Sequence, residues 1–182
     1  FDVLITALYK AELIDELGNW KGDDTVVVQL GDLLDRARPG SVEPEDPLEE
    51  LHILQFLEHL NKQASESNGA VITLIGNHEL MNLMGDFRYT TLNTINEFGG
   101  VAGRKEIFKP GGALAKHLGC SCFGICKIGD WIFVHGGILP KHLKDKKFTI
   151  KTINKLVQDL LFGKKNENNL TSDERDLIFG DE

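Results

Sequence analysis

The sequence predicts an α/β fold in which short strands and amphipathic helices alternate. Two apolar runs rich in β-branched residues, at positions 25–30 and 70–75, have the composition of short buried strands. A leucine stripe with helical spacing lies between them at positions 47–65, and a third apolar run follows at 131–134. Polar clusters follow all three runs. In α/β sheets the loops after the carboxyl ends of strands build binding sites, so we expect the site there.

The first part of the chain is predicted to form a helix, a turn and a strand. Apolar residues recur at helical spacing over positions 1–17, and Gly18 with Asn19 ends this helix. A polar turn at 19–24 then leads into the strand at 25–30. Because the chain begins in mid-helix and without an initiator Met, we expect it to be a piece of a longer product.

The clearest helical pattern covers positions 47–65. Pro47 stands at its start, and Glu49 and Glu50 favour the positive end of the helix dipole. His52 and His59 lie beside its apolar stripe, where we expect them to have structural roles.

The rest of the chain continues the alternation of strands and helices. We expect a strand at 70–75, helices at 91–98, 110–118 and 149–162, and two strands at 121–128 and 130–135 joined by a hairpin turn. Gly99 opens a glycine-rich, basic stretch that ends at Lys105, but it lacks the Gly-Lys-Ser/Thr of a phosphate-binding P-loop. Positions 163–173 are polar, and we expect them to be mobile.

Size and charge restrict the classes of partner. The 182 residues correspond to one domain, with 41% hydrophobic and 26% charged residues. The net charge of −8 argues against nucleic acids and anionic membranes, which bind basic surfaces. No apolar run approaches the roughly 18 residues of a membrane span. A phosphorylated substrate is still compatible, because metal ions and a single Arg can supply local positive charge.

Three cysteines fall within seven residues and admit two interpretations. Cys120, Cys122 and Cys126 follow His117, which would suit a zinc site or a strand whose thiols alternate between its faces. The spacing lacks paired CxxC motifs, so we favour the strand. We expect no disulfide, which favours a reducing, cytoplasmic location, although the sequence leaves localisation otherwise open.

The polar clusters contain ligands for hard metals beside a cation that can bind phosphate. Asp32, Asp35 and Arg36 follow the first strand, and Asn77 and His78 follow the second. His135 ends the third apolar run and adds an imidazole. Oxygen and nitrogen donors beside a planar guanidinium indicate a metal-assisted phosphoester site.

The motifs GDLLDR, GNHE and HGG, in this order, resemble those of the calcineurin-like metallophosphoesterases, in the phosphoprotein phosphatase branch. The flanking text VVVQLGDLLDR, GNHELMNLMGDFRY, FKPGGALAKHL and DWIFVHGGILPKHL resembles the Shewanella-like protein phosphatases. The resemblance covers about residues 1–162. It implies a metallophosphoesterase-type β-sandwich flanked by helices and incomplete at both ends. Residues 1–163 would then be its central part, and residues 164–182 a polar segment within or leading to the missing C-terminal part.

The resemblance implies a centre of two metal ions, Mn, Fe or Zn. Asp32 matches the carboxylate that bridges the two ions, and Asn77 and His135 match ligands of the second ion. These residue types suit all three metals, so the identity of the metal stays open.

The resemblance assigns the neighbouring side chains to the substrate. His78 would face the leaving-group oxygen as general acid, and Asp35 would hold its imidazole. Arg36 would grip two phosphate oxygens. We expect Glu79 to support its loop by hydrogen bonding. Arg88 could reach the substrate or pair with Asp86, and both alternatives stay open.

The implied reaction is direct hydrolysis of a phosphorylated protein or small phosphoester by metal-bound hydroxide. A thiol mechanism is excluded because no Cys-x5-Arg motif occurs. Further family ligands, an Asp and a His, would precede Phe1, while two His and an Arg would follow Glu182. We therefore expect the segment alone to be inactive. The alternatives are a dinucleoside-tetraphosphate hydrolase and a non-catalytic relative that binds phosphate or phosphoproteins. The oligomeric state is not predicted.

Overall fold

The computed structural model describes residues 1–35, 49–144 and 147–180, and the statements below concern these residues. The strands are β1 (Val26–Gln29), β2 (Ala70–Leu74), β3 (Cys122–Phe123), β4 (Ile125–Ile128) and β5 (Trp131–Val134). The helices are α1 (Asp2–Lys10), α2 (Glu49–Glu66), α3 (Asn77–Met84), α4 (Leu92–Glu97), α5 (Gly100–Phe108), α6 (Ala113–Ser121), α7 (Pro140–Leu143), α8 (Ile150–Leu161) and α9 (Ser172–Phe179), with a 3-10 turn, η2, at Glu167–Asn169.

Strands β1, β2 and β3 form a parallel sheet in that order. Val26 pairs with Ala70, and helix α2 makes the crossover between β1 and β2. Strand β2 is largely buried, as predicted for this run. Strand β1 is not: Val26 is 40% exposed, and β1 is an edge strand of this sheet. The expectation of two buried strands is therefore correct for β2 and wrong for β1.

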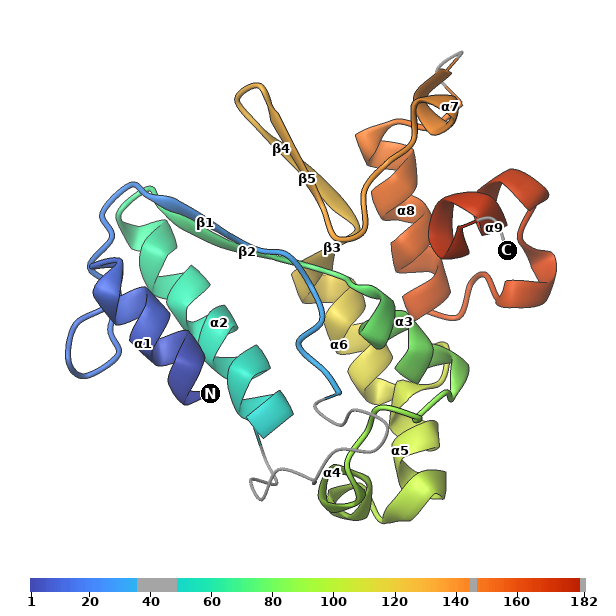
Figure 1. The fold of residues 1–182 in the computed structure, drawn as a ribbon, viewed down its shortest axis with the longest axis horizontal. Coiled ribbons are helices and arrows are strands. Elements are labelled where there is room, and N and C mark those ends of the chain that lie inside the picture. The colour runs from blue at the N-terminus through green and yellow to red at the C-terminus, as the bar shows by residue number, and fades with distance from the viewer. Residues whose placement is uncertain (36–48, 145–146, 181–182) are drawn as a thin grey trace.

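A second, antiparallel sheet consists of β4 and β5. The hairpin turn at Gly129 is confirmed, and the hairpin projects away from the helices (Figure 1). The single strand predicted at 121–128 is wrong, because the chain divides it between the two sheets at Gly124. A Cβ at this glycine would lie 2.7 Å from Val157 Cγ2, so the chain crosses between sheets against α8 where only glycine fits.

Helix α1 ends at Lys10 instead of continuing to residue 17. Glu12 has a left-handed φ of +58°, and Asp15 Oδ1 accepts the backbone N–H groups of Leu17 and Asn19 in a local turn. Ile14 is 1% exposed, so this apolar residue belongs to the core although it does not lie in a helix. A buried contact can therefore produce helical spacing where no helix forms.

The other predicted helices are present, and four further helices among the described residues were not predicted. The patterns at 47–65, 91–98, 110–118 and 149–162 correspond to α2, α4, α6 and α8. Helix α8 begins after Thr149, whose Oγ1 accepts the Thr152 N–H. The unpredicted helices are α3, which begins with the polar cluster itself, α5, which contains most of the glycine-rich stretch, and the later α7 and α9.

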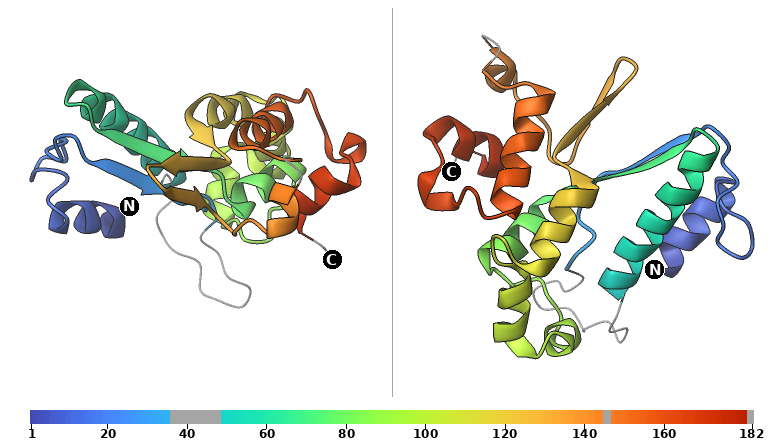
Figure 2. Two further views of the ribbon diagram at one scale, coloured as in Figure 1. Left: turned by 90° about the horizontal axis from the view of Figure 1, so that it is seen from above. Right: turned by 180° about the vertical axis from the view of Figure 1, so that it is seen from behind.

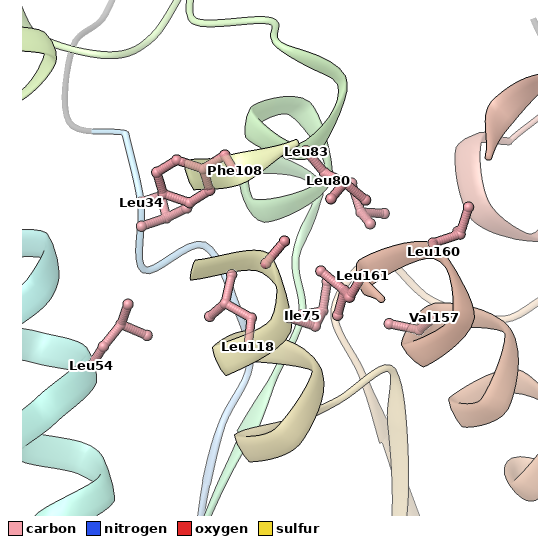
Figure 3. Close-up of a cluster of buried hydrophobic side chains, with 11 residues drawn as sticks. Leu34, Leu54, Ile75, Leu80, Leu83, Phe108, Leu118, Val157, Leu160 and Leu161 are labelled. Carbon is pink, nitrogen blue, oxygen red and sulfur yellow. The ribbon is translucent and has the colours of Figure 1, made fainter. Parts of the chain in front are cut away.

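Two hydrophobic clusters hold the elements together. The larger lies among α3, α5, α6 and α8, and Figure 3 shows Phe108, Leu118 and Leu161 pointing into it from three of these helices. The smaller joins α1 and α2 to β2 through Leu8, Leu60 and neighbouring residues. The figures show α1 and α2 at one end and α8 and α9 at the other, with the carboxyl ends of β1 and β2 directed toward the middle (Figures 1 and 2).

The polar C-terminal segment contains η2 and α9. Arg175 Nη1 lies 3.1 Å from Glu167 Oε1, and Lys165 pairs with Glu174. His142 of α7, which is buried, places Nε2 2.9 Å from Asp176 Oδ2 of α9. The mobility expected for positions 163–173 stays a prediction. No helix in the described parts of the chain is long and apolar enough to cross a membrane.

Candidate metal and phosphoester site

The loops after β1 and β2 meet at one edge of the sheet, because the two strands are parallel neighbours. The approach is close enough to require glycine on both sides. A Cβ at Gly31, where φ is +98°, would lie 2.6 Å from the Gly76 nitrogen. A Cβ at Gly76 would lie 2.2 Å from Asp32 Oδ1. The two polar clusters of the sequence therefore form one site.

Glu79 joins the two loops. Glu79 is 1% exposed, and its carboxylate accepts four backbone N–H groups. Oε2 accepts those of Gly76 (2.7 Å) and Asp32 (3.0 Å), and Oε1 those of Leu33 (2.8 Å) and Leu34 (3.1 Å). Burial raises the pKa of Glu79, and the amide donors oppose that shift. The expectation that Glu79 supports its loop by hydrogen bonding is confirmed.

Both aspartates of the first loop adopt left-handed backbone conformations. The φ of Asp32 is +57° and that of Asp35 is +68°. Such conformations cost of the order of 1 kcal/mol for a residue other than glycine, although Asp tolerates them better than most. Glu79 holds the first of these residues, and the Asp35 N–H donates to Glu50 Oε1 at 2.7 Å. The strained loop is thus fixed by two buried carboxylates from α2 and α3.

The three predicted metal ligands converge. His135 Nε2 lies 2.9 Å from Asn77 Oδ1 and 3.2 Å from Asp32 Oδ2. Its other ring nitrogen, Nδ1, lies 2.7 Å from the carbonyl oxygen of Leu30. Because a carbonyl accepts only, Nδ1 carries a proton, and the lone pair of a neutral imidazole is on Nε2. Metal-binding histidines are commonly oriented in this way.

The three donor atoms fit a metal ion by type, and the two distances from His135 Nε2 fit it by spacing. Oxygen and imidazole ligands about 2.0–2.2 Å from one ion lie about 3.0–3.4 Å apart at octahedral or tetrahedral angles, close to the two distances measured here. Within the described ranges, no three His, Cys, Asp or Glu residues form a potential metal site. The converging set contains two residues of these types, Asp32 and His135, together with the amide of Asn77.

His78 and Asp35 form the expected pair. His78 Nδ1 lies 3.0 Å from Asp35 Oδ2, and the His78 backbone N–H donates to Asp32 Oδ1 at 3.1 Å. The rings of His78 and Tyr89 pack in a T-shaped arrangement, with centroids 5.1 Å apart. The Asp35 side chain is fully buried and also accepts from Thr90 Oγ1 at 2.6 Å. A buried carboxylate therefore fixes an imidazole one residue away from a candidate metal ligand.

The structure describes one of the two arginines that the sequence suggested as substrate contacts, Arg88, and not the other, Arg36. Arg36, the predicted phosphate ligand, lies outside the described residues. Arg88 forks onto Asp86, with Nε 2.9 Å from Oδ1 and Nη2 2.8 Å from Oδ2, and its side chain is 73% exposed. The hydrogen bond from Arg88 holds the pKa of Asp86 below its usual range. The pairing alternative is thus observed, while contact with a substrate stays a prediction.

Three residues that surround Asp35 in the structure were not identified from the sequence: Glu50, Asn82 and Arg104. Asn82 Nδ2 donates to Asp35 Oδ2 at 2.8 Å, and Arg104 Nη2 lies 3.5 Å from Asp35 Oδ1. Asn82 follows His78 by four residues, a helical spacing that would have placed it beside the imidazole had α3 been predicted. No sequence pattern indicates the other two.

A groove of about 690 Å³ adjoins the site. Asn77, Leu80 and Met81 of α3 line one part of it, and Ile178 and Phe179 of α9 line another. The groove places apolar surface next to Asn77, one of the candidate metal ligands.

The three cysteines lie outside this site. Burial raises the pKa of Cys122 to about 12, and His117 pairs with Glu58 at 2.8 Å.

Residues 7–181 match the family described as calcineurin-like phosphoesterase. The chain belongs to the calcineurin-like phosphoesterase family. Its relatives include Shewanella-like protein phosphatase 2 of Arabidopsis thaliana, which is 31% identical over 84% of this chain and 46% of the relative. Shewanella-like protein phosphatase 1 of Plasmodium berghei is 35% identical over 81% of this chain and 38% of its own length.

Solved structures of cold-active protein tyrosine phosphatases have a similar fold. A mutant of a cold-active protein tyrosine phosphatase superimposes with a TM-score of 0.78 at 28% identity, covering 98% of this chain and 51% of that chain. The cold-active protein-tyrosine phosphatase of a psychrophilic Shewanella species gives 0.72 at 26% identity, with the same coverage. The chain thus spans about half the length of these relatives or less.

Proposed function

We propose that the protein containing this chain is a metal-dependent phosphatase that hydrolyses phosphomonoesters of proteins. The observation that carries this proposal is the convergence of Asp32, Asn77 and His135 next to the His78–Asp35 pair. Membership of the calcineurin-like phosphoesterases supports the reaction class, and the names of the relatives support phosphorylated proteins as substrates.

In this proposal the three converging side chains bind metal. A centre of two ions, which would be Mn, Fe or Zn, requires further ligands. A metal centre there would supply the positive charge that activates water and neutralises the phosphoryl group. The side chain of Asp32 is 33% exposed, so its carboxylate could be reached by a metal ion. His135 keeps its Nε2 directed at the other two donors through its bond to Leu30.

The substrate-facing roles go to His78, Asp35 and Arg36. His78 donates its Nε2 proton to the leaving oxygen, while Asp35 holds the ring through Nδ1. Arg36 binds two phosphate oxygens through its planar guanidinium. Hydrolysis then proceeds by direct attack of water on phosphorus, with no covalent bond to the protein.

We also propose that the β1-β2-β3 sheet and the β4-β5 sheet are parts of the β-sandwich of the family, within a domain whose central part is residues 1–163. Three donor atoms from the described residues are fewer than a paired centre uses. We therefore expect the isolated 182-residue chain to bind metal weakly and to be inactive.

The experiment compares p-nitrophenyl phosphate hydrolysis by this chain and by a longer product that contains it, each with and without manganese. We expect manganese-dependent activity in the longer product, abolished by Asp32→Asn. The matched control is Asp130→Asn at an exposed aspartate, which should leave activity unchanged. Phosphotyrosine and phosphoserine peptides then rank the substrates.

The other outcomes contradict parts of the proposal. Activity of the isolated chain would refute its expected inactivity. Binding of phosphopeptides without hydrolysis by the longer product would favour a non-catalytic relative. Cleavage of dinucleoside tetraphosphates in preference to phosphopeptides would favour that hydrolase class.

A further inference from the structure

Arg104 is a buried cation in contact with the candidate site. It lies on α5, in the glycine-rich stretch without a P-loop, and its side chain is 0% exposed. Its guanidinium carbon lies 4.8 Å from the ring centroid of Phe108 and 5.4 Å from that of Phe98. A charge so enclosed by aromatic rings is costly unless it is paired.

The polar partners of Arg104 lie on two helices that flank Asp35. Its Nε donates to Asn82 Oδ1 at 2.8 Å, and its Nη2 donates to Glu50 Oε2 at 3.0 Å. Its third nitrogen, Nη1, makes no hydrogen bond within the described part of the chain. The planar guanidinium thus bonds to residues of α3 and α2 at the same time, which a single lysine ammonium would not reproduce.

Three contacts connect Arg104 to Asp35. One is the direct ion pair, with Nη2 3.5 Å from Asp35 Oδ1. The second passes through Asn82, whose amide oxygen accepts from Arg104 while its amide nitrogen donates to Asp35 Oδ2. The third passes through Glu50, which accepts from Arg104 on Oε2 and from the Asp35 backbone N–H on Oε1.

We propose that Arg104 is a positioning residue for His78 in the phosphatase reaction, acting through the carboxylate of Asp35. This inference rests on the proposed function of the site. Asp35 Oδ2 receives both the Asn82 amide and His78 Nδ1, so the orientation of Asn82 decides where that oxygen points. Arg104 fixes Asn82 by occupying its amide oxygen, and Glu50 by pairing with its carboxylate.

A purely structural role of Arg104 predicts a different kinetic result. A general acid assists departure of a poor leaving group, such as phenolate or a serine alkoxide, far more than departure of p-nitrophenolate, which is stable without a proton. Loss of positioning should therefore depend on the leaving group. Damage to folding or to metal binding should reduce both reactions equally.

The experiment measures kcat for phenyl phosphate and p-nitrophenyl phosphate in the manganese-loaded longer product. Arg104→Lys should lower kcat for phenyl phosphate at least about tenfold more than for p-nitrophenyl phosphate, within the range of general-acid effects. Asp35→Asn should show the same selectivity, and the double variant should be no worse than Asp35→Asn alone. The control is Lys105→Met, at the exposed neighbour on α5.

Equal loss on both substrates, or additive losses in the double variant, would overturn the proposal. If Arg104→Lys fails to fold, Asn82→Leu interrupts the contact through Asn82 while the pair with Glu50 remains. This variant should give the same selectivity between the two substrates.

If the unsubstituted product hydrolyses neither phosphate, the proposed function fails instead. Positioning is then tested by NMR: the hydrogen-bonded Nδ1 proton of His78 should be observed in the unsubstituted protein and lost in Arg104→Lys. Its persistence would refute the inference.

Discussion

At the residue scale, three carboxylates near the site differ in burial and therefore in the groups that they can bind. Asp32 is partly exposed and lies among the converging donor atoms. Asp35 is fully buried and receives His78. Glu79 is buried and receives backbone N–H groups. A carboxylate open to solvent can take a metal ion, whereas one saturated by protein donors orients or supports other groups.

Replacement of Glu79 tests its supporting role. All four polar partners of Glu79 are N–H donors, so Glu79→Gln turns an amide NH₂ toward at least one of them. We expect a loss of about 2–4 kcal/mol in the free energy of unfolding, from lost charge-assisted bonds and unpaired buried donors. Urea denaturation measures it. The control is Glu106→Gln at an exposed site on α5, and a loss below about 1 kcal/mol for Glu79→Gln would contradict the role.

The residues that could be predicted from the sequence are those that follow strands within short motifs. Asp32, Asn77 and His135 converge because parallel strands bring their ends to one edge and a hairpin ends beside it. Glu50 and Arg104 could not be predicted, because they meet only when the folded chain brings α2 and α5 together beside Asp35. A buried ion pair of this kind has no periodicity along the chain.

At the element scale, prediction succeeded where one local signal dominates. Helix α8 has an apolar stripe and a threonine cap, and both follow from neighbouring residues. Helix α3 was missed because its first turn carries polar site residues, and its N-terminal support is the buried Glu79. The strand at 121–128 was misassigned because the division at Gly124 depends on contact with Val157, 33 positions later in the chain.

The pH dependence of α9 follows from Glu174. Its hydrogen bond with Lys165 lowers the pKa of Glu174, and Glu174 also accepts the Thr171 N–H in the N-terminal cap of α9. A depressed folded-state pKa contributes stability above the unfolded pKa, about 4.3, that is lost as the pH falls through the lower folded value.

We therefore expect the NMR amide signals of α9 to lose their folded positions on acidification below about pH 4. Lys165→Met should make α9 less stable at neutral pH and flatten this acid dependence. Lys155→Met, which removes an ion pair within α8, should leave the behaviour of α9 unchanged. An acid profile identical in Lys165→Met and the unsubstituted chain would contradict the assignment.

At the scale of the whole molecule, metal binding and stability should be linked. The three converging donors come from the segments that directly follow β1, β2 and β5, so an ion bound there connects both sheets. Binding to the folded state alone stabilises it by about 1.4 kcal/mol at a concentration ten times the dissociation constant, which for this size corresponds to about 3–6 °C in Tm.

The measurement is a thermal denaturation series with increasing manganese and with a chelator. We expect Tm to rise with manganese and to return to its starting value when the chelator removes the metal. Asp32→Asn should lose the shift, and Asp130→Asn should keep it. A shift that persists in Asp32→Asn would place the metal elsewhere.

The contact between the two strand-end loops also affects how fast a bound ion could leave. Gly31 and Gly76 bring the loops into direct contact, and Glu79 receives amide groups from both. Neither loop can separate from the other without breaking bonds to that one carboxylate. The loops should therefore open as a single cooperative unit, and the residence time of an ion between Asp32 and Asn77 would be set by this shared opening.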